Sequence, residues 1–166
     1  MYDSPGALRA IYRAGGRKHF DVVAAHPFTL QVSGVVKILT EARAVMRANG
    51  DARKPLLVTE LSWPSAKGKV KSRYGYEMTE SGQAARVRAA LPYLAARRGA
   101  LRIERVYWYS WLTRETDDVY PFDYAGLRRL EPDRVVAKPA YAAFRSTALR
   151  MQGCRKKSGD ATRCSR

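Results

Sequence analysis

The chain has 166 residues, which is long enough for one domain with a buried core. Its 31 lysines and arginines against 15 acidic residues give a formal net charge of +16. This charge admits nucleic-acid binding as an alternative function, but the basic residues, Arg43 among them, are spread over the outer faces of the predicted helices, and no nucleic-acid-binding motif is present. No apolar run could span a membrane and no signal peptide is visible, so we expect no membrane partner. The cellular location stays open, and secretion of a longer parent protein is compatible with the sequence.

The first predicted elements are a helix and a short buried strand. Residues 4–16 predict the helix, because Ser4 is a favourable N-cap and Gly15 can adopt the left-handed conformation that often ends a helix. Residues 20–28 predict a strand that is apolar almost to its end, where Pro27 breaks it.

Two further segments have apolar residues at the i, i+3, i+4, i+7 spacing of a helix. The first is residues 32–46, and Asn49 with Gly50 supplies its stop signal. The second is residues 84–94, and Pro92 inside this pattern should kink the helix or split it in two. Both segments therefore predict amphipathic helices that cover a sheet.

The most informative stretch is residues 54–63, Lys-Pro-Leu-Leu-Val-Thr-Glu-Leu-Ser-Trp. Its apolar run is typical of a strand that is covered on both faces. Strict alternation puts Glu60 on the same side as Leu56 and Val58. A carboxylate at the end of so apolar a strand is costly unless it has partners or a task, although a strand-end glutamate that faces water is the plain alternative.

The third predicted strand, residues 103–111, is rich in aromatic residues. The whole chain then alternates strand, helix, strand, helix, strand, helix, and the last helix begins near residues 138–140. This order indicates parallel βαβ units joined by right-handed crossovers. Long loops at residues 61–79 and 112–136 follow two of the strands, where α/β proteins place their functional sites.

Three parallel strands would leave unpaired edges, which folded proteins normally cover. We therefore expect residues 1–151 to be the C-terminal portion of a larger α/β barrel, with a missing N-terminal half-barrel as its structural partner. Residues 152–166 lack apolar periodicity and predict a disordered basic tail. Cys154 and Cys164 in this tail lie away from any histidine pair, so we expect no metal site and no cofactor, and their pairing in a disulfide stays open.

Four motifs resemble a known family by their order. They are His26-Pro27-Phe28 after a buried strand, Thr59-Glu60 with Trp63 beyond it, the aromatic run of residues 106–111, and the Lys-Pro-Ala-Tyr sequence that opens the last helix. Together they resemble the C-terminal part of the clan A glycoside hydrolases, in the style of families 39 and 5, over residues 4–150. The resemblance implies an α/β fold that is a partial TIM (β/α)8 barrel with strands 6 to 8, an O-glycosyl hydrolase with retaining chemistry, and a carbohydrate substrate.

The same resemblance implies roles for individual residues. Glu60 takes the place of the catalytic nucleophile at the end of strand 7, and His26 takes that of the site histidine on strand 6. Trp108 or Trp111 takes the place of the strand 8 tryptophan that floors the sugar subsite.

The residue types suit this chemistry without the resemblance. Glu60 can act as a nucleophile where a hydrogen bond from His26 or from a tyrosine keeps it ionised. Trp63 and the other two tryptophans offer flat apolar faces to sugar rings, although core packing is the alternative for each of them. A satisfied core histidine is the alternative for His26. The basic loop of residues 67–74 follows Glu60 in the sequence, which leaves an anionic sugar open as the substrate.

Two departures from the family pattern bear on the expected activity. The family usually carries a tyrosine two residues after the strand 6 histidine, where this chain has Phe28, and Tyr109 or Tyr74 is the candidate replacement; Tyr109 is also a candidate for substrate binding. The family's general acid/base lies in an Asn-Glu-Pro motif, which is absent here. Retaining hydrolysis needs two carboxyl groups about 5–5.5 Å apart. We therefore expect a hydrolase fragment that is inactive alone, with an inactive glycan-binding remnant as the alternative.

Overall fold

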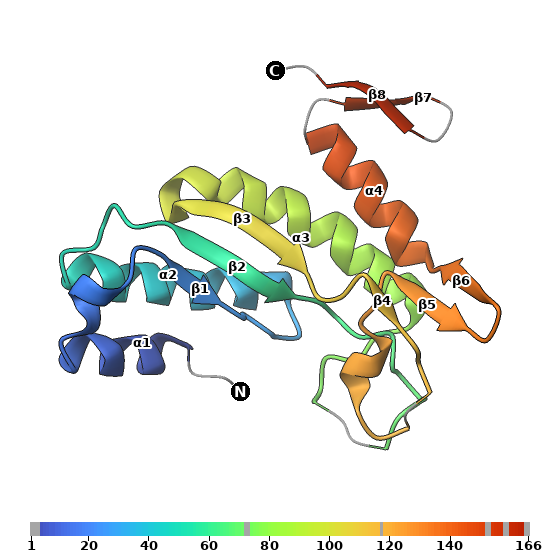
Figure 1. Ribbon diagram of the computed structural model, residues 1–166, viewed down its shortest axis with the longest axis horizontal. Helices are drawn as coiled ribbons and strands as arrows, with labels where there is room; N and C mark the ends of the chain where they lie inside the picture. The colour runs from blue at the N-terminus through green and yellow to red at the C-terminus, as the bar shows by residue number, and fades with distance from the viewer. Residues whose placement is uncertain (1–3, 72–73, 117, 152–153, 158–159, 165–166) are drawn as a thin grey trace. The chain divides into compact units, whose positions relative to one another are not determined.

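The computed structural model describes residues 4–71, 74–116, 118–151, 154–157 and 160–164, the last two ranges by their backbone only. The chain divides into two units, Met1–Ser62 with Ala96–Tyr109, and Trp63–Ala95 with Ser110–Arg166. One long helix, α3 (Glu80–Leu101), contributes to both units (Figure 1). In the described part of the chain, no helix is both long enough and apolar enough to cross a membrane.

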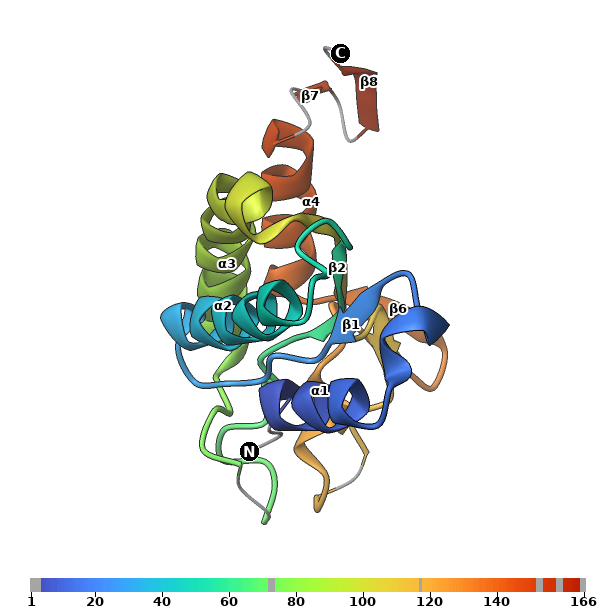
Figure 2. The same ribbon diagram turned by 90° about the vertical axis from the view of Figure 1, so that its left-hand side faces the viewer.

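The first unit is built on a three-stranded parallel sheet. Its strands are β1 (Val23–Ala25), β2 (Leu56–Leu61) and β3 (Ile103–Trp108), in the order β1-β2-β3. Helices α1 (Ser4–Arg13) and α2 (Val32–Ala48) contact each other and lie side by side in Figures 1 and 2. The predicted parallel βαβ arrangement is therefore confirmed as a mixed α/β fold with three parallel strands.

The core of the first unit joins both helices to one face of the sheet. Its buried members are Leu8, Tyr12, Val23, Ala42, Val45, Met46 and Leu56. On the neighbouring row of the sheet, Ala24 and Arg105 are exposed and Leu57 between them is half-buried. Parallel sheets are normally covered on both faces, so this half-open row is unusual for such a sheet.

The helix boundaries follow the signals in the sequence. Gly15 and Gly50 have φ angles of 80° and 79°, in the left-handed region that glycine adopts at low cost. Helix α3 continues through Pro92, so the predicted split is wrong, whereas the alternative of a kink at Pro92 stays a prediction. Burial of Val87 and Leu94 on either side of the proline offsets the cost of about 3 kcal/mol that an internal proline brings.

Arg43 of α2 is the main departure in the first unit. It was expected on an outer helix face, but only 1% of it is exposed. Its Nε donates to the Leu101 carbonyl oxygen at 3.0 Å, and its Nη1 donates to the Lys54 carbonyl oxygen at 2.8 Å. Burial is the main cause that lowers the pKa of the Arg43 guanidinium. Arg43 thus ties α2 to the end of α3 and to the segment that enters β2.

Asp51 is a second buried polar residue, in the segment between α2 and β2, and only 5% of it is exposed. It accepts hydrogen bonds from the Tyr12 hydroxyl at 2.8 Å and from Arg17 Nε at 3.2 Å, and Lys54 Nζ lies 2.9 Å from it. Burial alone would raise the pKa of Asp51, but the bonds from Lys54, Tyr12 and Arg17 outweigh it and lower the pKa. Burial, followed by the bond to Asp51, raises the pKa of Tyr12 to about 12.

We expect Asp51→Asn to lower the melting temperature by about 4–8 °C at neutral pH, because about 2 kcal/mol of charged hydrogen bonding is lost at roughly 2–4 °C per kcal/mol. A carboxyl group with a lowered pKa in the folded state stabilises the fold above its unfolded pKa of about 3.9, and loses this contribution as the pH falls through the folded pKa. The difference in melting temperature between wild type and Asp51→Asn should therefore disappear in acid. Melting curves of both proteins between neutral pH and about pH 2 measure it.

The matched control for this experiment is Asp133→Asn, because Asp133 is exposed. This control should leave the melting temperature nearly unchanged at every pH. A gap for Asp51→Asn that stays constant down to strong acid would contradict the assignment of the lowered pKa to Asp51.

The second unit contains a small mixed sheet. Strand β4 (Leu112–Thr113) pairs in parallel with β5 (Arg128–Glu131), which pairs antiparallel with β6 (Arg134–Ala137). A 3-10 helix, η2 (Pro121–Tyr124), and helix α4 (Pro139–Met151) complete the unit. The predicted start of the last helix is confirmed.

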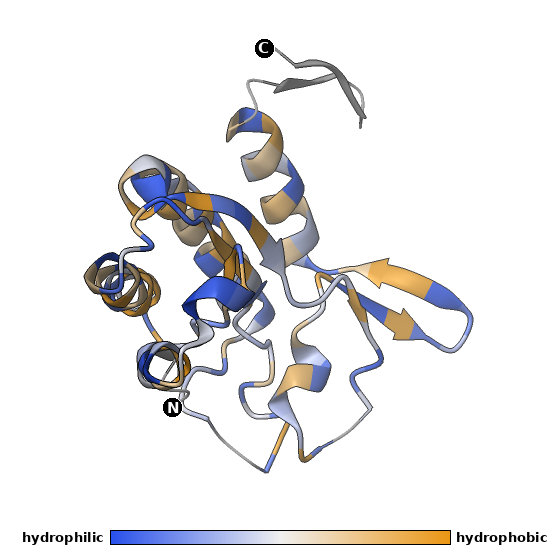
Figure 3. Cartoon of the chain, turned by 60° about the vertical axis from the view of Figure 1, so that its left-hand side comes forward, coloured by the Kyte–Doolittle hydropathy of each residue, from blue (hydrophilic) through white to orange (hydrophobic). Residues whose placement is uncertain are grey.

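The long loop predicted at residues 112–136 contains regular structure, because β4, β5 and most of β6 lie within it. The sequence signal for the ribbon of β5 and β6 is the turn sequence Pro132-Asp133, which lies between two short segments that each carry apolar residues. Figure 3 shows apolar residues in both strands of the ribbon and hydrophilic residues at its turn. Strands this short have too little periodicity to be recognised from sequence.

The basic tail contains two short strands, β7 (Cys154–Lys157) and β8 (Asp160–Cys164), which pair antiparallel with Cys154 opposite Cys164. Residues 152–153, 158–159 and 165–166 of this tail lie outside the described residues. A two-stranded ribbon is only marginally stable in water, so the disorder of residues 152–166 stays a prediction.

Candidate functional site

Glu60 lies near the C-terminal end of β2, where the strand departs from regular pairing. Val58 pairs with Val106 and Leu61 pairs with Trp108, so β2 has one residue more than β3 between these two pairs. An extra residue of this kind reorients side chains and is frequent next to active sites. The side chain of Glu60 is 33% exposed while Leu61 is buried, so the prediction that Glu60 shares the buried side of Val58 is wrong.

His26 follows β1 directly and meets Glu60 from the neighbouring strand. Its Nδ1 lies 3.4 Å from Glu60 Oε2, and its side chain is 45% exposed. The Phe28 amide donates to the His26 carbonyl oxygen at 2.9 Å, and the two rings meet edge to face at 6.4 Å. His26 is therefore not a core histidine, and a tight turn holds its imidazole beside the carboxylate.

The third strand brings two aromatic residues to the same edge of the sheet. Half-buried Trp108 ends β3 opposite Leu61, and the amide of Tyr109 donates to the Leu61 carbonyl oxygen at 3.1 Å. The arrowheads of β1, β2 and β3 point to one edge in Figure 1. The structure thus places His26, Glu60 and the start of the aromatic run at the C-terminal ends of three adjacent parallel strands.

The other predicted site residues belong to the second unit. Trp63 is fully buried, so its ring has no face open to a sugar, and the structure supports core packing for it. Trp111 is 53% exposed and Tyr74 is 51% exposed. Of these three residues, only Trp111 and Tyr74 can present an aromatic face to a ligand in this structure.

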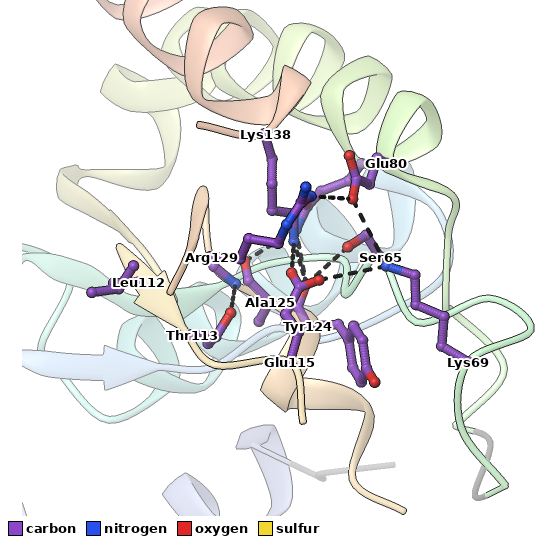
Figure 4. Close-up of polar contacts among 12 residues, drawn as sticks. Ser65, Lys69, Glu80, Leu112, Thr113, Glu115, Tyr124, Ala125, Arg129 and Lys138 are labelled. Atoms are coloured by element: carbon purple, nitrogen blue, oxygen red, sulfur yellow. Dashed lines mark hydrogen bonds and ion pairs between the residues drawn. The ribbon is translucent and has the colours of Figure 1, made fainter. Parts of the chain in front are cut away.

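A network of charged side chains in the second unit was not found from the sequence (Figure 4). Lys138 is completely buried, and its Nζ donates to Glu115 Oε1 at 2.6 Å and to the Tyr124 carbonyl oxygen at 2.9 Å. Burial lowers the pKa of the Lys138 ammonium, and the hydrogen bond to Glu115 opposes this shift. The sequence signal for this network is Lys138, a lysine at the start of a helix, but its position there predicts only the helix start and no buried partner.

Two lysines of the basic loop, Lys69 and Lys71, are also paired with acidic side chains. Lys69 Nζ lies 3.5 Å from Glu115 Oε2 and 3.8 Å from Glu80 Oε1, and Lys71 Nζ lies 2.6 Å from Asp118 Oδ2. Arg129 bonds Glu80 at 3.0 Å on the other side of the network. The two lysines are therefore already paired with acids, which weakens the case for this loop as the binder of an anionic sugar.

No family model matches the chain, and no curated protein matches it. Within the described residues, no three His, Cys, Asp or Glu side chains come together in a group that could hold a metal ion.

Proposed function

We propose that this chain is the nucleophile-bearing part of a retaining O-glycosyl hydrolase, formed by the last three βα units of a (β/α)8 barrel. The observation that carries the proposal is the 3.4 Å contact between the His26 imidazole and the Glu60 carboxylate at neighbouring strand ends. Barrel enzymes build their sites at the C-terminal ends of their strands. Trp108 at the end of the third strand supplies an aromatic residue beside this pair.

The form of the parallel sheet supports the barrel. Strands β1 and β3 are its outer strands, and among the described residues each of them pairs only with β2. The row that contains Leu57 is only half-covered. Further parallel strands from an N-terminal half-barrel would pair with both edges and enclose this face as the barrel interior.

The chemistry assigns separate tasks to the two residues. In the proposed reaction, the His26 imidazole orients the carboxylate through the 3.4 Å contact of its Nδ1 with Oε2 of Glu60, which leaves Oε1 to attack the anomeric carbon of the sugar. That attack breaks the bond to the leaving group and forms a glycosyl ester, which water then hydrolyses with retention of configuration. We assign the general acid/base to no residue of this chain, because the chain lacks an Asn-Glu-Pro motif.

The proposal is tested by covalent labelling with 2,4-dinitrophenyl 2-deoxy-2-fluoro-glycosides of several sugars. Dinitrophenolate leaves without protonation, so the missing acid does not prevent the first step. We expect one sugar of the panel to add its mass to the peptide that contains Glu60. Glu60→Gln should abolish the label, and Glu104→Gln on exposed Glu104 is the matched control.

Two results would decide against the proposed role. A label that persists in Glu60→Gln, or that maps to another residue, excludes Glu60 as the nucleophile. A chain that binds glycans through Trp111, which is 53% exposed, yet is never labelled by any sugar supports the inactive glycan-binding remnant instead.

A further inference from the structure

Arg128, the first residue of β5, has an unusual environment for a partly buried cation. Its Nε is buried and has no hydrogen-bond acceptor, and its side chain forms no ion pair with any residue that the structure describes. The next residue, Arg129, bonds both Glu80 and Glu131 at 3.0 Å. An unpaired buried donor costs roughly 1–3 kcal/mol, so the arrangement at Arg128 calls for a physical reason.

Two aromatic rings hold the Arg128 guanidinium in place. Its central carbon lies 4.1 Å from the centre of the Tyr141 ring and 5.2 Å from that of Trp111. The two rings meet edge to face at 5.4 Å, with an interplanar angle of 82°. The Arg128 amide also donates to the Trp111 carbonyl oxygen at 3.0 Å, which fixes the two residues side by side. The two rings and the backbone hydrogen bond therefore fix the position of the guanidinium, and no described acidic side chain neutralises its charge.

Trp111 keeps a large open surface in this arrangement. It is 53% exposed, and the neighbouring Leu112 is 38% exposed. An exposed indole ring packs well against the C–H face of a sugar, and it does so at low entropic cost because the ring is already held in place. A half-exposed indole ring therefore lies beside a cation that has no acidic partner among the residues that the structure describes.

We infer that Trp111 and Arg128 form a subsite for an anionic sugar, a pyranose that carries a carboxylate or sulfate group. The planar guanidinium carries N–H donors that match a carboxylate or sulfate, and because Nε is buried, a ligand would approach the Nη edge of the fork. That the ligand is a sugar rests on the proposed function, whereas its negative charge rests on Arg128. The sequence had suggested the basic loop of residues 67–74 as the binder of an anionic sugar. Lys69 and Lys71 of that loop are paired with acids, so we assign this role to Arg128 instead.

The test is a titration of the full chain with three probes in about 0.15 M salt, where long-range attraction to the +16 chain is screened beyond roughly 8 Å. The probes are trigalacturonate, a sulfated galactose disaccharide and neutral galactotriose, and binding is followed by tryptophan fluorescence and by calorimetry. We expect at least one anionic probe to bind about tenfold more tightly than the neutral one, or about 1.4 kcal/mol. Whichever anionic probe binds shows whether the acidic group of the sugar is a carboxylate or a sulfate.

Variants separate the site from general charge attraction. Arg128→Gln should remove the preference for the anionic probe, and Trp111→Ala should weaken binding of all probes. Arg150→Gln removes the same charge from an exposed residue near the end of α4 and should bind like wild type. Arg128→Lys keeps the charge but loses the planar fork, so it should retain only part of the preference; it also serves if Arg128→Gln does not fold.

Equal affinity for the neutral and anionic probes, equal losses in Arg128→Gln and Arg150→Gln, or no binding of any probe would each overturn the subsite. None of these outcomes affects the labelling of Glu60, so the two proposals fail separately. Conversely, binding that depends on Arg128 in a chain that no fluoro-glycoside labels would preserve the subsite and reject the hydrolase.

Discussion

Residues 1–166 should hydrolyse phenyl glycosides no faster than the background reaction, yet should release dinitrophenolate from a 2,4-dinitrophenyl glycoside when azide is added. Protonation of the leaving group by a positioned acid contributes about 10²–10⁴-fold, and phenolate requires this help whereas dinitrophenolate does not. The rate ratio between the two substrates should therefore exceed that of a complete retaining enzyme by about this factor. Initial rates over a series of azide concentrations measure it.

The role of azide follows from the second step of the reaction. In the proposed mechanism, Glu60 attacks the anomeric carbon as the bond to dinitrophenolate breaks, and the glycosyl ester then needs a nucleophile that no general base has to deprotonate. Azide attacks the same carbon, breaks the ester bond and frees the carboxylate of Glu60. The product is a glycosyl azide with the configuration of the substrate, which NMR identifies.

Controls for this prediction address Glu60 directly. Glu60→Gln should abolish the release that depends on azide, whereas Glu104→Gln, an exposed glutamate on β3, should leave it unchanged. Turnover of phenyl glycosides at ordinary enzyme rates of about 1–10³ s⁻¹ would show that this chain contains a complete site. Release that survives Glu60→Gln would exclude Glu60 as the nucleophile.

The largest effect on stability is expected at the buried pair of Lys138 and Glu115. The Lys138 and Glu115 side chains are 0% and 6% exposed, and their charged atoms lie 2.6 Å apart. Removal of one partner from a buried pair leaves an uncompensated charge and costs about 3–5 kcal/mol. We expect Glu115→Gln to lower the free energy of unfolding by this amount, as measured by urea denaturation.

The double variant Lys138→Met with Glu115→Leu should lose much less stability than Glu115→Gln alone, because no unpaired charge then remains in the core. The Tyr124 carbonyl oxygen would keep its bonds from the Ser65 amide at 3.0 Å and hydroxyl at 3.2 Å. Arg134→Gln is the control, since Arg134 is 74% exposed in its pair with Glu131 and surface pairs contribute about 0–1 kcal/mol. If the double variant lost as much stability as Lys138→Met and Glu115→Leu lose when each is made alone and the two losses are added, the energetic coupling of the pair would be contradicted.

Backbone geometry makes Glu115 a sensitive position for this experiment. Its φ angle of 58° lies in the left-handed region, where residues other than glycine pay an energetic cost. The bonds from Lys138 and Lys69 compensate for this conformation from two sides. Loss of the carboxylate should therefore also loosen the segment before η2, which faster hydrogen exchange of its amides would reveal.

Local signals in the sequence were sufficient for the frame of the first unit. The apolar runs before His26 and Glu60 identified two strands, and the helical spacing between them required a parallel crossover. Parallel neighbours end at the same edge of a sheet, so the proximity of His26 and Glu60 could be predicted from the sequence. Helix ends at Gly15 and Gly50 followed from conformations that few other residues adopt.

Tertiary structure alone decided the features that depend on distant partners. The extra residue between Val58 and Leu61, which exposes Glu60, arises from pairing with a strand more than forty residues later. The burial of Trp63 and the contact of Lys138 with Glu115 likewise depend on which surfaces meet across the second unit. Propensity and periodicity describe only the segment in which a residue lies. Burial, strand pairing and the compensation of charge are set by packing between segments, and local sequence patterns do not reveal that packing.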